Sequence, residues 1–142
     1  MNTKNYQNSL VFIIPTLTNT DGLIKVLKLL SEFNESDKVI IVNNNKKQNL
    51  NELLPLKEIK NKIVILDQNK NTGFAKACND GAKKAQELYN PDFFVFLNDD
   101  VSYKSDFANS CVNYMNIKKW DSGTPILMQT NGEIENVGYK VL

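Results

Sequence analysis

The chain has 142 residues, a hydrophobic fraction of 42%, a charged fraction of 23% and a net charge of +1, a composition typical of one ordinary globular domain. All 17 basic residues are lysine, so neither excess positive charge nor arginine favours nucleic acid as a partner. The chain has no histidine, which excludes the common zinc sites and histidine-based catalytic triads.

Four short apolar runs predict the strands of a sheet. They are rich in β-branched and aromatic residues and do not alternate with polar residues, which is typical of strands covered on both faces. In chain order they are residues 10–14 (LVFII), 39–42 (VIIV), 63–66 (IVIL) and 93–97 (FFVFL).

Helical patterns separate these runs. After the first run, Thr20 or Asp21 can cap a helix whose apolar face consists of Leu23, Val26, Leu27 and Leu30. A weaker helical piece, interrupted by Pro55, is expected at residues 51–59.

A longer helix is expected at residues 74–89, and another after the fourth strand. The first has an apolar stripe made of Phe74, Ala77, Cys78, Ala85 and Leu88. The second can be capped by Ser105, and its apolar residues are Phe107, Cys111 and Met115.

Strands that alternate with helices predict right-handed βαβ units and therefore an α/β fold with a mostly parallel sheet. The end of the chain differs, because an Asn-Gly turn at residues 131–132 lies between two extended pieces and predicts a β-hairpin. No repeat or linker divides the sequence, so residues 1–142 are expected to form a single domain.

Polar residues follow every predicted strand, and open α/β sheets bind ligands at the carboxyl ends of their strands. The most informative end is the fourth, where Asp99 and Asp100 follow a buried strand. Adjacent carboxylates repel unless a cation is present, and Mg²⁺ or Mn²⁺ commonly takes one or two protein carboxylates together with substrate phosphates. The alternative is an ordinary polar turn or helix start, and the position after a buried strand favours the metal site.

A second informative stretch is residues 71–81 (NTGFAKACNDG). Gly73 opens a helix whose first N–H groups can meet a ligand, and Gly81 lies inside the helix at a cost of about 1 kcal/mol relative to alanine. A close approach of the helix to the sheet would explain Gly81, and an ordinary helix with a tolerated glycine is the alternative. Phosphate-loop, dinucleotide and nucleophile-elbow motifs do not occur.

In their order and spacing, FIIPTLTN, VIIVNNN, NTGFAKACNDG and FFVFLNDDV resemble family 2 glycosyltransferases of the GT-A fold, and the rhamnosyltransferase-like subset in particular. The later segment GTPILMQTNGEIENVGYKVL is similar to a pattern of the same subset, so that the resemblance covers residues 10–138. It implies a three-layer α/β/α GT-A fold that binds a nucleotide-diphosphate sugar.

The resemblance also implies the roles of individual residues. The predicted metal ligands are Asp100, most directly, and Asp99, which would also contact ribose or sugar; the first aspartate of the family's signature is Asn98 here. Asn43 stands where an aspartate commonly reads the base. The residues expected around the nucleotide sugar are Pro15, Thr16, Leu17, Asn43, Asn45, Asn71, Gly73, Lys76, Asn98 and Asp99.

The expected function is therefore donor binding by a glycosyltransferase. It would use Mg²⁺ or Mn²⁺ to bind a UDP-, dTDP- or GDP-linked sugar, for inverting transfer to a hydroxyl of a glycan or lipid-linked acceptor in surface-glycan biosynthesis. In the family, the region after the hairpin provides the general base, and no sequence follows Leu142 here. The chain is thus expected to be truncated on the acceptor side, and the base cannot be assigned.

Two alternatives remain. The first is a non-catalytic nucleotide-sugar-binding or assembly module without its own general base. The second is a nucleotidyltransferase, which the loop PTLTNTDG disfavours because such enzymes usually have a glycine-rich basic loop after the first strand.

The expected location is the cytoplasm, either free or at the inner face of the membrane. The polar N-terminus lacks the apolar stretch of a signal peptide, and no apolar run is long enough to span a membrane. Cys78 and Cys111 lie in predicted helices, which favours a reduced, intracellular protein. The oligomeric state is left open.

Overall fold

The computed structural model describes residues 8–30, 36–53, 62–104 and 106–136. The chain divides into two compact units, residues 1–105 and residues 106–142. The expected single-domain organisation stays a prediction.

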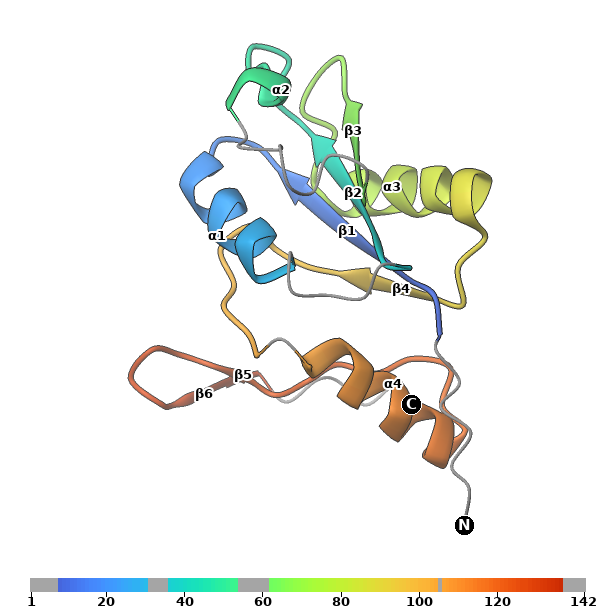
Figure 1. Cartoon of the computed structure of the whole chain (residues 1–142). Helices are drawn as coiled ribbons and strands as arrows, with labels where there is room; N and C mark the ends of the chain where they lie inside the picture. The colour runs from blue at the N-terminus through green and yellow to red at the C-terminus, as the bar shows by residue number, and fades with distance from the viewer. Residues whose placement is uncertain (1–7, 31–35, 54–61, 105, 137–142) are drawn as a thin grey trace. The chain divides into compact units, whose positions relative to one another are not determined.

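The first unit contains a four-stranded parallel sheet with the order β3-β2-β1-β4 (Figure 1). Its strands are β1 (Leu10–Thr16), β2 (Lys38–Asn43), β3 (Ile63–Asp67) and β4 (Phe93–Phe96), which confirms the four strands predicted from apolar runs. The helices between them are α1 (Thr20–Leu30), α2 (Leu50–Leu53) and α3 (Phe74–Tyr89). The alternation of strands and helices therefore gives the expected α/β fold.

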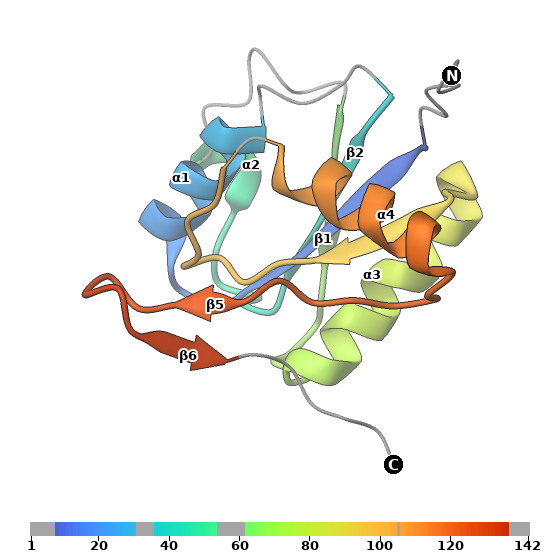
Figure 2. The ribbon, with the colours of Figure 1, turned by 90° about the horizontal axis from the view of Figure 1, so that it is seen from below.

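The sheet is covered on both faces, since α1 and α3 lie on opposite sides of it in two perpendicular views (Figures 1 and 2). On the α3 face, Val11 and Ile13 of β1 and Ile40 and Val42 of β2 pack with Ala77 and Ala85 of the helix. On α1, the predicted apolar residues Leu23, Val26, Leu27 and Leu30 are all buried. This is the three-layer arrangement that the family resemblance implies.

The expectation that all four strands are covered on both faces is wrong for β4. Phe94 and Phe96 are 36% and 49% exposed, and they pair in register with Val11 and Ile13 of β1, which face α3. Because α3 packs over β1 and β2, this face of the edge strand β4 extends beyond the helix.

The cap of α1 differs from the prediction. Asn19, rather than Thr20 or Asp21, accepts the Gly22 N–H through its side-chain oxygen at 3.1 Å, and its backbone carbonyl accepts the Leu23 N–H. An N-cap side chain pairs with an N–H two or three residues further on, which Asn19 reaches and Thr20 does not. Of the helix expected at residues 51–59, α2 contains the beginning, and residues 54–61 lie outside the described residues.

Helix α3 has the predicted bounds, and its contact with the sheet is close. Gly81 is buried, and a Cβ there would lie 2.6 Å from Ile13 Cγ2 and 2.9 Å from Val42 Cγ2. The close approach therefore explains the glycine within the helix. Phe74 and Leu88, expected on the buried stripe, are instead 57% and 46% exposed, because they lie at the two ends of the helix, outside the contact made by its small residues.

The second unit contains α4 (Phe107–Lys118) and a hairpin of β5 (Leu127–Met128) and β6 (Ile134–Asn136). Gly132 has a φ of 87° in the turn, and the strands are antiparallel, which confirms the hairpin predicted from the Asn-Gly pair. On α4, Met115 is buried as expected, whereas Phe107 and Cys111 are only half-buried. The predicted cap Ser105 lies outside the described residues, and the N-cap is Asp106.

In the part of the chain that the structure describes, no helix has both the length and the apolar character needed to cross a membrane.

Gly81→Ala tests the helix–sheet contact. We expect the variant to lose about 1–3 kcal/mol of unfolding free energy from overpacking against Ile13 and Val42, offset in part by about 1 kcal/mol of helix propensity. Urea unfolding measures this loss. Lys83→Ala, on the exposed side of α3, is the control and should change the free energy by less than about 0.5 kcal/mol. Equal stability of the two variants would contradict the contact.

The stability of the fold is expected to depend on pH through a contact between Ser9 and Asp92, at the start of the sheet. Ser9 donates its N–H and its hydroxyl to Asp92 Oδ2 at 2.8 and 3.0 Å, and these bonds, the backbone bond first, lower the pKa of the Asp92 carboxyl. A depressed carboxyl pKa stabilises the fold above the unfolded pKa of about 3.9, and this contribution is lost as the pH falls through the folded pKa.

Asp92→Ala should therefore be less stable than wild type at pH 7, and the difference should narrow below about pH 4. Urea unfolding between pH 3 and pH 7 measures it. A difference that stays constant over this range would contradict the assigned role of Asp92.

Candidate functional site

The carboxyl ends of three strands lie side by side. In the parallel register, Thr16 of β1 pairs with Asn43 of β2, which pairs with Asp67 of β3. The backbone continues this alignment, since Asn44 N–H donates to the Thr16 carbonyl and Gln68 N–H donates to the Asn43 carbonyl, both at 2.9 Å. The sheet therefore presents one polar edge, as expected of a parallel α/β sheet.

Thr16 joins this edge to the acidic loop after β4. It is buried, and its hydroxyl donates to Asp99 Oδ2 at 2.6 Å. Asn19 adds a second link, because its Nδ2 donates to the Asp99 carbonyl at 3.3 Å while its Oδ1 caps α1. Both the side chain and the backbone of Asp99 are thus held in position.

Asp100 is the free carboxylate of the pair. Asp99 is half-buried, whereas Asp100 and Asn98 are exposed. Within the described ranges, no hydrogen bond or ion pair engages the Asp100 carboxylate, and no group of three acidic, cysteine or histidine residues could hold a metal ion. Metal binding by Asp99 and Asp100 stays a prediction.

Asn43, expected to read the base, is committed to contacts inside the protein. It is 1% exposed, and its Nδ2 donates both hydrogens, to Asp67 Oδ1 at 2.8 Å and to the Gln48 carbonyl at 2.9 Å. Its Oδ1 accepts the Asn45 N–H at 3.0 Å. Asn43 therefore braces the loop after β2 and positions Asp67.

The loop before α3 is held by a second buried asparagine. Asn44 Oδ1 accepts from the hydroxyl of Thr72 at 3.0 Å and from its N–H at 3.4 Å. Asn71 Oδ1 accepts the Gly73 N–H at 2.9 Å, and Gly73 has a φ of 80°, which glycine adopts without strain. These bonds fasten the start of α3 to the end of β2.

Lys76, expected near phosphates, forms an ion pair with Asp80 one turn along α3. Its Nζ lies 2.8 Å from both carboxylate oxygens, and this bond, above all others, lowers the pKa of Asp80. Gln68 Nε2 also donates to Asp80, at 3.0 Å. A role for Lys76 at phosphates would require it to leave Asp80, and it stays a prediction.

The remaining predicted residues lie beside this edge. Pro15 is buried within β1, opposite Val42, while Leu17, the first residue after the strand, is 40% exposed. Asn45 is half-buried and lines a cavity of about 400 Å³.

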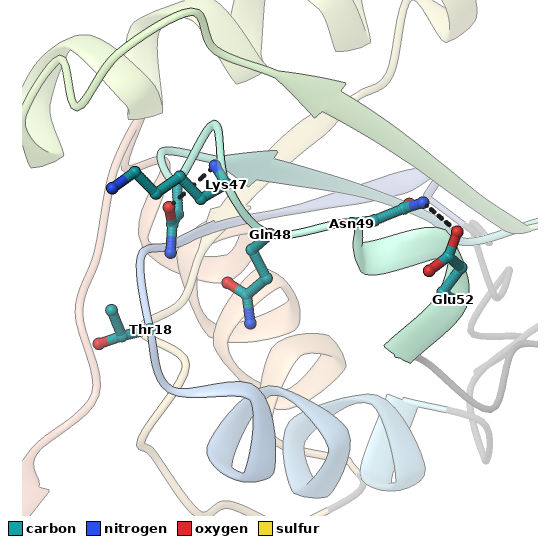
Figure 3. Close-up of a pocket in the computed structure, with 6 residues that line it drawn as sticks. Thr18, Lys47, Gln48, Asn49 and Glu52 are labelled. Carbon is teal, nitrogen blue, oxygen red and sulfur yellow. Dashed lines mark hydrogen bonds between the residues drawn. The ribbon is translucent and has the colours of Figure 1, made fainter.

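Six residues line this cavity, and sequence analysis identified only one of them. They come from the loop after β1, the loop after β2 and α2, and they are Thr18, Asn45, Lys47, Gln48, Asn49 and Glu52 (Figure 3). The others were missed because they have no motif spacing and polar residues are common in loops. The polar run from Asn43 to Asn49 after a buried strand was the only available signal.

Gly22→Ala tests the link between α1 and the acidic loop. A Cβ at this position would overlap the Asp99 carbonyl oxygen and the Asn19 side-chain amide. We therefore expect the variant to lose about 1–3 kcal/mol of unfolding free energy, measured by urea unfolding. Lys25→Ala, on the exposed side of α1, should stay within about 0.5 kcal/mol of wild type. A Gly22→Ala variant as stable as Lys25→Ala would show that α1 does not approach Asp99.

Comparison with solved structures places this fold among glycosyltransferases. The mannosyltransferase PcManGT from Pyrobaculum calidifontis, in complex with GDP-Man and Mn²⁺, matches with a TM-score of 0.65 and 14% identity over 78% of this chain and 33% of its own. Residues 1–349 of TarS from S. aureus, in complex with UDP, match with a TM-score of 0.60 and 16% identity over 88% and 43%. The chain thus spans less than half the length of these proteins, and at such identities the likeness shows the fold alone.

No match was found among curated protein sequences. The sequence profile of glycosyl transferase family 2, in contrast, matches residues 11–130, which include the carboxyl ends of all four strands of the parallel sheet and the first part of the second unit. The chain belongs to glycosyl transferase family 2.

Proposed function

We propose that this chain is the donor-binding part of a glycosyltransferase that binds a nucleotide-diphosphate sugar through Mg²⁺ or Mn²⁺. The observation that carries the proposal is the state of the two aspartates after β4. Asp99 is held by Thr16 and Asn19, while Asp100 presents a free carboxylate at the polar edge of the sheet. Membership of the family and the fold shared with PcManGT and TarS support it.

In this proposal Asp100 is the direct ligand of the ion, and Asp99 contacts the ion or the ribose through the oxygen that Thr16 leaves free. When bound, the ion neutralises negative charge on the departing diphosphate. The protein supplies the positions of its ligands, since Thr16 and Asn19 orient Asp99 before a donor arrives. Leu17 and the loop at Asn71 and Gly73 border the nucleotide.

The reaction proposed for the whole protein is inverting transfer to an acceptor hydroxyl of a glycan or a lipid-linked sugar, at the cytoplasmic side of the membrane. Such transfer needs a general base to remove the hydroxyl proton as the oxygen attacks the anomeric carbon. We assign no base. Glu133 and Glu135 belong to the hairpin of the second unit, at no strand end of the parallel sheet.

Calorimetry tests donor binding directly. The whole chain should bind at least one of UDP, dTDP and GDP more tightly with Mn²⁺ than with EDTA. Asp100→Asn should weaken binding in Mn²⁺ by tenfold or more, on the order of the loss expected from damage to a metal site, and leave binding in EDTA unchanged.

Glu87→Gln removes one carboxylate from the exposed surface near the far end of α3 and is the matched control, with binding equal to wild type. Binding that does not depend on metal, or an Asp100→Asn variant that responds to Mn²⁺ as wild type does, would contradict the metal site. Failure of all three nucleotides to bind would contradict the proposed function.

A further inference from the structure

The buried residue Asn43 uses its whole amide inside the protein. Its Nδ2 donates to Asp67 Oδ1 at 2.8 Å and to the Gln48 carbonyl at 2.9 Å. Its Oδ1 accepts the Asn45 N–H, so that one backbone donor and one backbone acceptor fix which end of the amide is the oxygen. With both hydrogens donated and an exposed fraction of 1%, Asn43 offers no donor to a ligand.

Asp67, its partner in the neighbouring strand, keeps one carboxylate oxygen for a ligand. It is the last residue of β3 and pairs in register with Asn43. Its Oδ1 accepts from Asn43, and no other hydrogen bond or ion pair engages the carboxylate within the described ranges. Because Asp67 is exposed, a ligand at the edge of the sheet can reach it. Its Oδ2 is therefore an accessible acceptor on a side chain that Asn43 holds in place.

The strand order places Asp67 where a nucleotide held at the acidic loop would extend. Asp99 is fixed to the end of β1 by Thr16, and β4 forms the border of the sheet on that side. The polar edge therefore continues from the acidic loop in one direction, over the ends of β2 and β3. Thr16 and Asp67 are two strand spacings apart, or about 10 Å. With a diphosphate at Asp100, the ribose and base of an extended nucleotide would cover this span.

We propose that Asp67 Oδ2 selects the base of the donor by accepting the ring N–H of a lactam base, which is uracil, thymine or guanine. This inference rests on the proposed function, because it assumes that the chain binds a nucleoside diphosphate. Cytosine and adenine have a ring nitrogen without a hydrogen at the corresponding position, and its lone pair would face the carboxylate. Asn43 is then a positioning residue, since it acts on the base only through the carboxylate that it holds.

Pairs of nucleotides that differ at this ring nitrogen test the inference. Calorimetry of the whole chain with Mn²⁺ compares UDP with CDP, dTDP with 5-methyl-dCDP, and GDP with ADP. For the nucleotide that binds, wild type should favour the lactam member of the pair by about tenfold or more, the usual effect of one hydrogen bond to a charged group.

Asp67→Asn exchanges a single acceptor atom for a donor. Its amide oxygen can still accept from Asn43, so the new NH₂ group takes the place of Oδ2. This group opposes the N–H of a lactam base and can donate to the ring nitrogen of cytosine or adenine. The preference for the lactam member should therefore fall by about tenfold or more, while the ratio of affinities in Mn²⁺ and in EDTA stays that of wild type. Glu87→Gln, the same change on the exposed surface of α3, should keep the wild-type preference.

The outcomes separate this inference from the proposed function. If wild type binds CDP, 5-methyl-dCDP or ADP at least as tightly as the lactam partner, the inference is wrong and donor binding stands. An Asp67→Asn variant with the wild-type preference also overturns it. So does a variant that loses affinity equally for both members of a pair, because such a loss reflects a structural role. If none of UDP, dTDP and GDP binds, the proposed function fails and the inference fails with it.

Discussion

The hydrogen bond from the Thr16 hydroxyl to the Asp99 carboxylate is the contact on which the candidate site depends. It joins the end of β1, at the centre of the sheet, to the loop after the edge strand β4, where both aspartates lie. Thr16 is buried and its backbone is paired within the sheet, so Asp99 is held by a residue of the core sheet. Asp100, the next residue, is thereby directed to solvent as a free carboxylate.

Two buried asparagines add further hydrogen bonds along the edge of the sheet. Asn43 ties β2 to Asp67 and to the loop that carries Gln48, while Asn44 ties the same strand to Thr72 before α3. Each amide both donates and accepts, so one short side chain can satisfy several backbone groups at once. The polar residues at the strand ends therefore divide into those that brace the loops and those that remain available to a ligand.

The close packing of α3 completes the arrangement. Gly81 and small residues of the helix allow it to lie against β1 and β2, so that its first residues, Gly73 and Phe74, are placed beside the polar edge. A larger residue at position 81 would move the helix away from the sheet. Core packing on one face of the sheet and the position of a candidate ligand loop are consequently coupled.

The sequence by itself determined the strands, the bounds of α3, the hairpin and the family, because continuous apolar runs, helical spacing and an Asn-Gly turn are local signals. It also placed Asp99 and Asp100 at a strand end. Only the tertiary structure decided which polar side chains are free: it pairs Asn43 and Lys76 within the protein, caps α1 with Asn19, and leaves Asp100 and Asp67 Oδ2 without partners among the described residues. The physical reason is that hydrogen-bond partners such as Thr16 and Asp99 lie far apart in the chain, and no local pattern encodes their pairing.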